Sequence, residues 1–145
     1  MFGALLLACV YDLLIMERNT RQRDTIRDVL ANSKQPLSPF EVLVAGRRSL
    51  RGLGIATVYR TINSLVEAGW LNAVELPGDA PRYEKAGSGH HHHFQCRECS
   101  GVFEIRGCPG DLSSLTPPGF VLEGHEVVLY GRCETCVAAK STVGS

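Results

Sequence analysis

Two Cys-x-x-C pairs constrain this chain more than any other feature of its sequence. The pairs are Cys96/Cys99 and Cys133/Cys136, and 33 residues lie between them. Four thiolates at two tight turns form the closed tetrahedral set of structural zinc. Disulfides or Cys-x-x-C redox chemistry are the alternatives, but two such pairs in a 145-residue chain indicate metal. We therefore predict structural Zn²⁺ here, and we expect the other cysteines, Cys9 and Cys108, to be inert.

Four consecutive histidines precede the first pair, in the stretch GSGHHHHFQCREC. A closed four-Cys site has no room for them. In an extended segment successive side chains point to opposite faces, so His90 and His92 would face one way and His91 and His93 the other. The tract can therefore serve two interleaved sites, unless it is a solvated, tag-like run. Further ligands would have to come from elsewhere in the chain, where the candidates are His125, Glu84, Glu104 and Asp111.

Charge is distributed unevenly along the chain. The formal net charge is zero, which taken alone argues against nucleic-acid binding. Residues 17–63, however, carry nine Arg or Lys against four acidic residues, whereas residues 64–145 carry six against ten. A basic half joined to an acidic half is typical of a nucleic-acid-binding module attached to a second function.

The first half contains three predicted helices. Thr20 is a candidate N-cap for the first helix, in TRQRDTIRDVLANS. Ser38 and Glu41 form a capping box for the second, with Pro39 at its first position. The third lies in GLGIATVYRTINSLVEAG and ends at Gly69. Its predicted buried face consists of Val58, Ile62, Leu65 and Val66.

A hairpin completes the pattern of the first half. The stretch LNAVELPGDAPRYEK predicts two short strands around the turn PGDAP. Three short helices followed by a hairpin is the order of a winged helix, in which the last helix enters the major groove of DNA. The exposed face of that helix carries Thr57, Tyr59, Arg60, Asn63 and Ser64. We predict that this face contacts DNA; the alternative is a merely solvated face with Tyr59 half-buried.

The N-terminal stretch MFGALLLACVYDLLIM is apolar but does not resemble a targeting segment. It lacks a basic start and a small-residue cleavage site, and Asp12 interrupts it. An apolar run of about 15 residues is shorter than the roughly 20 that span a bilayer. We expect a cytoplasmic protein with no membrane contact. Residues 1–15 are either an extra packed helix or sequence preceding a true start at Met16.

Together these motifs resemble the ferric uptake regulator family of metal-dependent repressors. The matching stretches are TRQR, ATVYRTINSLVEAGWL, HHHHFQCREC and LYGRCETC, which cover about residues 20–136 in the family's order. The resemblance implies an α+β fold: an N-terminal winged-helix DNA-binding domain (residues 16–86, after the extension 1–15) and a small α/β dimerisation domain with the four-Cys zinc site (residues 87–145). It also implies a homodimer that binds an operator in double-stranded DNA.

The resemblance assigns residues to roles. It places structural zinc at Cys96, Cys99, Cys133 and Cys136. It implies a dimerisation-domain site at His90, His92, Asp111 and His125, and a hinge site at Glu84, His91, His93 and Glu104. The residues that we predict to bind DNA are Arg23, Thr57, Tyr59 and Arg60.

The chain departs from the family pattern at several positions. Pro36 stands near the place where members often supply a histidine to the hinge site. Asn72 and Ala86 stand where zinc-sensing members commonly have an aspartate and a cysteine. Ser100 replaces the usual glycine after the first Cys-x-x-C, and IRGCPGDLSSLTPPGF is shorter than the usual helix. These departures leave the subfamily open.

The donor atoms suit several metals. A His/His/Asp/His set suits Zn²⁺, Fe²⁺, Mn²⁺, Co²⁺ or Ni²⁺. The uninterrupted histidine run resembles zinc uptake regulators most closely, so we predict a zinc-responsive repressor. Iron or manganese sensing, or peroxide sensing by oxidation of His91 or His93, are the alternatives within the family. From other classes, a small zinc hydrolase or a protein-binding zinc-ribbon adaptor would fit; we expect no enzyme, because no H-E-x-x-H-like signature occurs.

Overall fold

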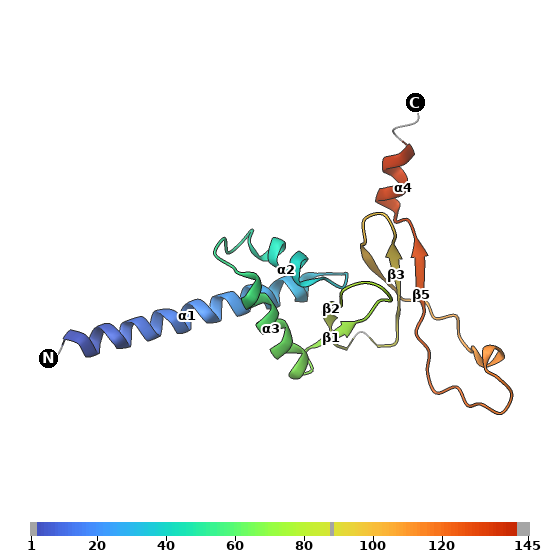
Figure 1. Ribbon diagram of the computed structural model, residues 1–145, viewed down its shortest axis with the longest axis horizontal. Helices are drawn as coiled ribbons and strands as arrows, with labels where there is room; N and C mark the ends of the chain where they lie inside the picture. Colours follow the sequence, from blue (N-terminus) through green and yellow to red (C-terminus); the bar gives the residue numbers. More distant parts are fainter. Residues whose placement is uncertain (1–2, 88, 142–145) are drawn as a thin grey trace. The chain divides into compact units, whose positions relative to one another are not determined.

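The computed structural model describes the backbone of residues 3–87 and 89–141 and the side chains of residues 18–87 and 89–140. The chain forms two compact units (Figure 1). The first consists of Met1–Ser33 and Leu37–Ala86, and the second of Lys34–Pro36 and Gly87–Ser145. No helix among the described residues is both long and apolar enough to cross a membrane.

The first unit has three helices and a two-stranded sheet, in the order predicted. The elements are α1 (Gly3–Asn32), α2 (Pro39–Gly46), α3 (Ile55–Glu67), β1 (Leu71–Val74) and β2 (Arg82–Lys85). Nine buried apolar residues from the helices, β1 and the segment before α3 form one core: Ile26, Leu30, Val42, Leu43, Leu53, Val58, Ile62, Leu65 and Leu71. The winged-helix element order is therefore confirmed.

The first helix begins earlier than the sequence indicated. α1 runs without a break from Gly3 to Asn32, so the predicted start at Thr20 is wrong. Neither Pro nor Gly occurs between residues 4 and 32, and nothing else in that stretch stops a helix. A good N-cap residue marks a start only where the preceding segment cannot be helical. The predictions for residues 1–15 concern side chains outside the described ones.

The capping box at the start of α2 is confirmed, and it is tied to the hairpin. Glu41 Oε2 accepts a hydrogen bond of 2.8 Å from the backbone N–H of Ser38, and Ser38 Oγ accepts one of 3.3 Å from the N–H of Glu41. The same carboxylate oxygen accepts from Arg82 Nη1 at 2.6 Å. Arg82 is buried, and a buried positive charge needs a negative partner, which Glu41 supplies. The ion pair also fixes β2 against α2.

α3 buries the face that its spacing predicted. Val58, Ile62 and Leu65 are buried, and Val66 packs partly buried against the same core. The chain leaves the helix through Gly69, whose φ of 70° lies in the left-handed region where glycine is favoured. The hairpin follows directly, with β1 antiparallel to β2 in the register Leu71↔Lys85.

The second unit is built on a three-stranded sheet in the order β4-β3-β5. The central strand β3 (His92–Cys96) pairs antiparallel with β4 (Val102–Ile105) and parallel with β5 (Val128–Gly131). A short 3-10 helix, η1 (Ser113–Leu115), lies between β4 and β5, and α4 (Glu134–Ser141) follows β5. Of the strand-like stretch FVLEGHEVVLYGRC, only Val128–Gly131 pairs as a strand; residues 120–127 do not.

Candidate metal centres and DNA-binding face

The four cysteines of the two Cys-x-x-C pairs converge in the second unit. Their sulfur atoms all lie within 4.8 Å of one another, and Cys99 Sγ lies 3.8 Å from Cys133 Sγ. A tetrahedral zinc with Zn–S bonds of about 2.3 Å places its sulfurs about 3.8 Å apart. The spacing of the thiols therefore fits zinc. The set forms because Cys96 ends β3, while Cys133 and Cys136 flank the start of α4.

The cluster is electrostatically prepared for a cation. Hydrogen bonds from the backbone N–H groups of Cys99 and Cys133 lower the pKa of Cys96 to about 6. Hydrogen bonding with Cys133 and burial raise the pKa of Cys136 to about 12. Zinc binds the deprotonated form of cysteine, so ligation at Cys136 would release a proton.

Tight turns in this region explain a departure from the family pattern. Ser100 has a φ of 58°, a left-handed conformation that costs a non-glycine residue about 1–2 kcal/mol. Glycine is the usual solution at such a position. Gly101 is needed for a different reason: a Cβ there would lie 3.2 Å from both Cys99 Sγ and the Phe103 ring. The chain therefore tolerates strain at Ser100 and keeps the glycine where side chains leave least room.

The histidine tract divides as alternation predicts. The rings of His90 and His92 are 4.6 Å apart, and those of His91 and His93 are 4.9 Å apart. His125 joins the first pair, with ring-centroid distances of 4.9 Å to His90 and 5.1 Å to His92. The alternation is thus confirmed. Metal binding by either pair stays a prediction.

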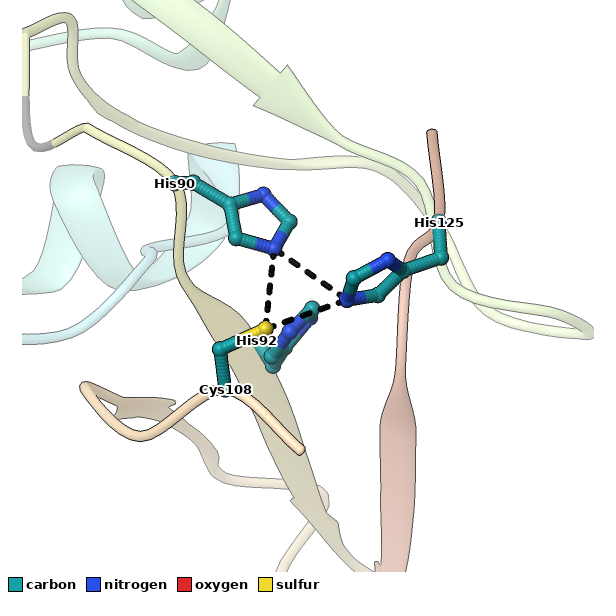
Figure 2. Close-up of side chains that lie close together, drawn as sticks. All are labelled: His90, His92, Cys108 and His125. Atoms are coloured by element: carbon teal, nitrogen blue, oxygen red, sulfur yellow. Dashed lines mark hydrogen bonds between the residues drawn. The ribbon is translucent and has the colours of Figure 1, made fainter. Parts of the chain in front are cut away.

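A fourth side chain completes the first histidine cluster, and it is not the one that the resemblance implied. Figure 2 shows Cys108 among the three imidazoles, with its sulfur 3.2 Å from His125 Nε2 and 3.6 Å from His90 Nε2. His90 Nε2 and His125 Nε2 are 3.3 Å apart. Asp111 is not in this group; its two carboxylate oxygens accept hydrogen bonds of 2.8 Å from the N–H and hydroxyl of Ser113.

Sequence reasoning thus missed Cys108, which we expected to be inert. Its only local signal was the turn sequence CPGD, since nothing else near it in the chain marks a ligand. The clustering depends on the long-range approach of the chain around residue 125 to β3, which spacing along the sequence does not reveal.

His92 is the buried member of the cluster. Its Nδ1 accepts a hydrogen bond of 3.1 Å from the N–H of Val127, while its Nε2 is buried without a hydrogen-bond partner. Burial lowers the pKa of His92, and the charges of nearby His90 and His125 add to this effect. The ring is therefore neutral at neutral pH, which is the state that ligates metal.

The second histidine pair lies beside an acidic residue of the neighbouring strand. His93 is paired with Glu104 across the antiparallel β3–β4 ladder, a position that brings side chains within reach. Glu104 Oε1 also lies 3.5 Å from Arg106 Nε. An open pocket here is lined by His90, His91, Glu104 and Arg106. The remaining residue of the predicted hinge set, Glu84, is half-buried on β2 of the first unit, opposite Asn72.

The predicted DNA-binding residues lie on one exposed surface of the first unit. Tyr59 is 50% exposed and Arg60 is exposed. Arg60 Nη2 lies 3.4 Å from Thr57 Oγ1, one helical turn earlier. Arg23 of α1 reaches the same face, where its Nη2 donates to Ser64 Oγ at 3.3 Å. A basic, hydroxyl-bearing helix face of this kind can contact phosphates and base edges.

Known proteins share both the sequence pattern and the fold. The pattern of the ferric uptake regulator family matches residues 16–130. The ferric uptake regulation protein of Campylobacter jejuni is 31% identical over 129 residues, which cover 86% of this chain and 82% of that protein.

Two solved structures extend this comparison. The ferric uptake regulator of Helicobacter pylori, described as having three functional metal-binding sites, superposes with a TM-score of 0.65 at 26% identity. The match covers 90% of this chain and 93% of that one. A zinc-bound manganese uptake regulator has a TM-score of 0.67, also at 26% identity, over 77% of this chain and 87% of its own.

Proposed function

Because this chain belongs to the ferric uptake regulator family and is thus a metal-responsive transcriptional regulator, we propose that the metal to which it responds is zinc. One observation carries the choice: the imidazoles of His90, His92 and His125 converge in the second unit, apart from the four cysteines. Imidazole nitrogen suits zinc and iron alike, whereas manganese is better served by carboxylate oxygen, so the convergence favours zinc or iron over manganese. The uninterrupted histidine run, which resembles that of zinc uptake regulators, favours zinc over iron.

We further propose that the chain acts in the cytoplasm as a homodimeric repressor on a palindromic operator. A two-fold symmetric dimer presents two recognition helices to two half-sites, which explains why operators of such proteins are palindromic. The exposed face of α3 supports this role through Tyr59 and Arg60, with Arg23 beside it. Arg60 would be placed to read a base edge, and Arg23 to hold a phosphate.

The second predicted set, Glu84, His91, His93 and Glu104, is proposed as the hinge site. Glu84 belongs to the first unit and the other three to the second. A metal ion held by residues of both units would couple metal binding to DNA binding, because each equilibrium then influences the other. The pairing of His93 with Glu104 on neighbouring strands supports the second-unit half of this set.

A mobility-shift experiment tests the zinc proposal. The full-length, zinc-loaded protein selects a binding sequence from a random pool of DNA duplexes. Binding to the selected duplex is then compared with zinc, manganese or ferrous iron added, and with the regulatory metal removed by a mild chelator. We expect binding only with zinc. Equal or better binding with iron or manganese would transfer the assignment to those metals, and selection of no sequence would favour a protein-binding adaptor.

Paired histidine variants test the division into two sites. Replacing His90 and His92 by Ala should remove one metal ion per chain and weaken zinc-dependent DNA binding. Replacing His91 and His93 by Ala should remove a different ion and abolish that dependence, since these residues belong to the proposed hinge. Each double variant serves as the control for the other. Identical losses of metal from both would mean one shared site.

A further inference from the structure

We propose that Cys108 is a metal ligand, so that the regulatory set in the second unit is one thiolate and three imidazoles from Cys108, His90, His92 and His125. The resemblance assigned this position in the set to Asp111. The inference deepens the proposed function and rests on it for its regulatory meaning. The assignment of the ligand itself rests only on geometry within the second unit.

The distances within the cluster fit a tetrahedral site. Zinc bonds of about 2.0–2.1 Å to nitrogen and 2.3 Å to sulfur place two nitrogens about 3.3 Å apart, and a nitrogen and a sulfur about 3.6 Å apart. The observed separation of His90 Nε2 and His125 Nε2 is 3.3 Å. Cys108 Sγ lies 3.6 Å from His90 Nε2 and 3.2 Å from His125 Nε2. Two edges of the tetrahedron thus match their expected lengths, and the third, between Cys108 Sγ and His125 Nε2, is 3.2 Å against an expected value of about 3.6 Å.

The local sequence holds Cys108 in this position. In CPGD, the ring of Pro109 restricts its own φ to about −65°, and Gly110 has a φ of 85°, a conformation that favours glycine. The N–H of Gly110 then points back to Cys108 Sγ at 3.4 Å. This contact within the segment holds the sulfur in place beside the histidines.

Asp111, three residues further along, is held away from the histidine cluster. Both of its carboxylate oxygens are engaged by Ser113 at the start of η1, and these hydrogen bonds lower the pKa of Asp111. To ligate with the three histidines, Asp111 would have to break both bonds and displace Cys108. The sulfur needs no such rearrangement.

His92 provides an independent sign that a ligand belongs here. Its Nε2 is buried without a hydrogen-bond partner, and such a group costs free energy unless something satisfies it. Ligation through Nε2 would require the ring proton to move to Nδ1, and the hydrogen bond that Nδ1 accepts from the N–H of Val127 would be lost in return for the metal bond. The buried imidazole completes the set as its fourth corner.

A thiolate changes which cations the site prefers. Sulfur and imidazole together favour zinc over manganese, which binds better to oxygen donors. Four protein ligands also close the coordination sphere, so the site leaves no open position for water, unlike a catalytic zinc. The set is therefore that of a selective zinc-binding centre.

Cobalt(II) is the probe that distinguishes sulfur from oxygen ligation. The full-length protein, with one zinc per chain retained in the four-Cys site, is titrated with Co²⁺ while its absorption spectrum is recorded. We expect a thiolate-to-cobalt charge-transfer band in the near ultraviolet. Cys108→Ser should abolish that band, while the matched variant Asp111→Asn should leave it unchanged. Retained zinc in the four-Cys site shows that each variant is folded.

Competition between metals provides the second measurement. Cys108→Ser should weaken zinc binding at this site by at least the roughly 10–100-fold that even loss of an outer-shell partner costs. Cys108→Asp should reduce the preference for zinc over manganese. A band that persists in Cys108→Ser, or cobalt binding lost in Asp111→Asn, would overturn the assignment.

The mobility-shift experiment separates this inference from the proposed function. Suppose that the wild-type protein shows the band and binds zinc through Cys108, but does not bind DNA in a zinc-dependent way. That result would support Cys108 as a metal ligand and refute the proposal that the protein is a zinc-responsive repressor. Zinc-dependent DNA binding together with an unchanged metal preference in Cys108→Ser would support the zinc-responsive repressor and refute the assignment of Cys108 as a ligand.

Discussion

The two units of this molecule bury different kinds of side chain. The first encloses nine apolar residues in one core, with five more packed partly buried around it. Among the described residues of the second unit, the buried side chains are Pro36, His92, Cys96 and Val102. Two of these four carry candidate metal-binding atoms. Hydrophobic burial therefore accounts for the fold of the first unit, whereas we expect the second to need stabilisation from metal and from a partner.

The exposed surface of the second unit points to that partner. It presents several large apolar side chains at 41–84% exposure: Leu115, Phe120, Val121, Leu122, Leu129, Tyr130 and Val137. A small unit with so little core and so much exposed apolar surface is typical of one that is covered by association. We expect the homodimer to cover part of this surface, as the family resemblance implies.

Loss of structural zinc should have the largest effect on folding and should affect the second unit only. Cys96→Ser or Cys133→Ser should release one zinc per chain and unfold the second unit, because structural zinc sites contribute about 10–16 kcal/mol of folding free energy. Hydrogen exchange resolved by segment, with zinc analysis, would measure this. Slow exchange should persist in residues 20–74. A folded dimer with unchanged zinc content would refute the assignment.

A core substitution in the first unit should produce the opposite pattern. Ile62 is fully buried in α3, so Ile62→Ala should lower the free energy of unfolding of that unit by about 2–5 kcal/mol. The metal content of the second unit should not change. Phe40→Ala is the matched control, since Phe40 is 67% exposed and its loss should cost much less. Denaturant unfolding and zinc analysis on the same samples test both statements; loss of zinc in Ile62→Ala would contradict the independence of the units.

Substitution on the exposed face of α3 should affect DNA binding without affecting either fold. Arg60→Ala should weaken operator binding by about 1–3 kcal/mol if a base edge is read, and Tyr59→Ala should weaken it too. Arg132→Ala, an exposed arginine of the second unit, serves as the control. Titrations at fixed salt concentration would measure this. Unchanged affinity in both α3 variants would mean that the face is only solvated.

Deletion of residues 1–15 should have the smallest effect. The side chains through which α1 enters the core, Ile26 and Leu30, lie well after Met16, and the family pattern also begins at residue 16. A protein starting at Met16 should therefore retain its melting temperature, dimerisation and operator affinity. Aggregation or weaker DNA binding on deletion would show that the apolar stretch contributes to the fold.

Local chemistry made much of the first unit predictable. The capping box at Ser38 and Glu41, the buried face of α3 and the left-handed stop at Gly69 each depend on residues within one or two helical turns. The predicted start of α1 at Thr20 was wrong, because a capping residue does not mark the start of a helix when the preceding sequence is also helical. Helix propensity ranks the possible starting points of a helix but does not exclude any of them.

The candidate sites likewise include residues that the local sequence indicated and one residue that it did not. Spacing revealed the four cysteines, and the two-residue period of an extended chain revealed how the histidines pair. The sequence did not reveal Cys108 as a candidate ligand, because its position beside His90 and His125 depends on segments that are distant in the sequence. A single cysteine also has no spacing pattern that would indicate a metal site. Residues 120–127 likewise have strand composition without strand pairing, since pairing depends on a neighbour.

The four identical histidines have one more consequence, which comes from the end of β3. Moving this strand by one residue against its neighbours would exchange the two histidine pairs between faces, while leaving histidines on both faces. The tract by itself is therefore degenerate and does not define which histidines face His125. Cys96 removes the degeneracy, because it is held opposite Gly131 and within the four-Cys cluster. The four-Cys cluster thus fixes the register of β3 and, with it, which histidines face His125; loss of the zinc that we predict there would remove this register together with the fold of the second unit.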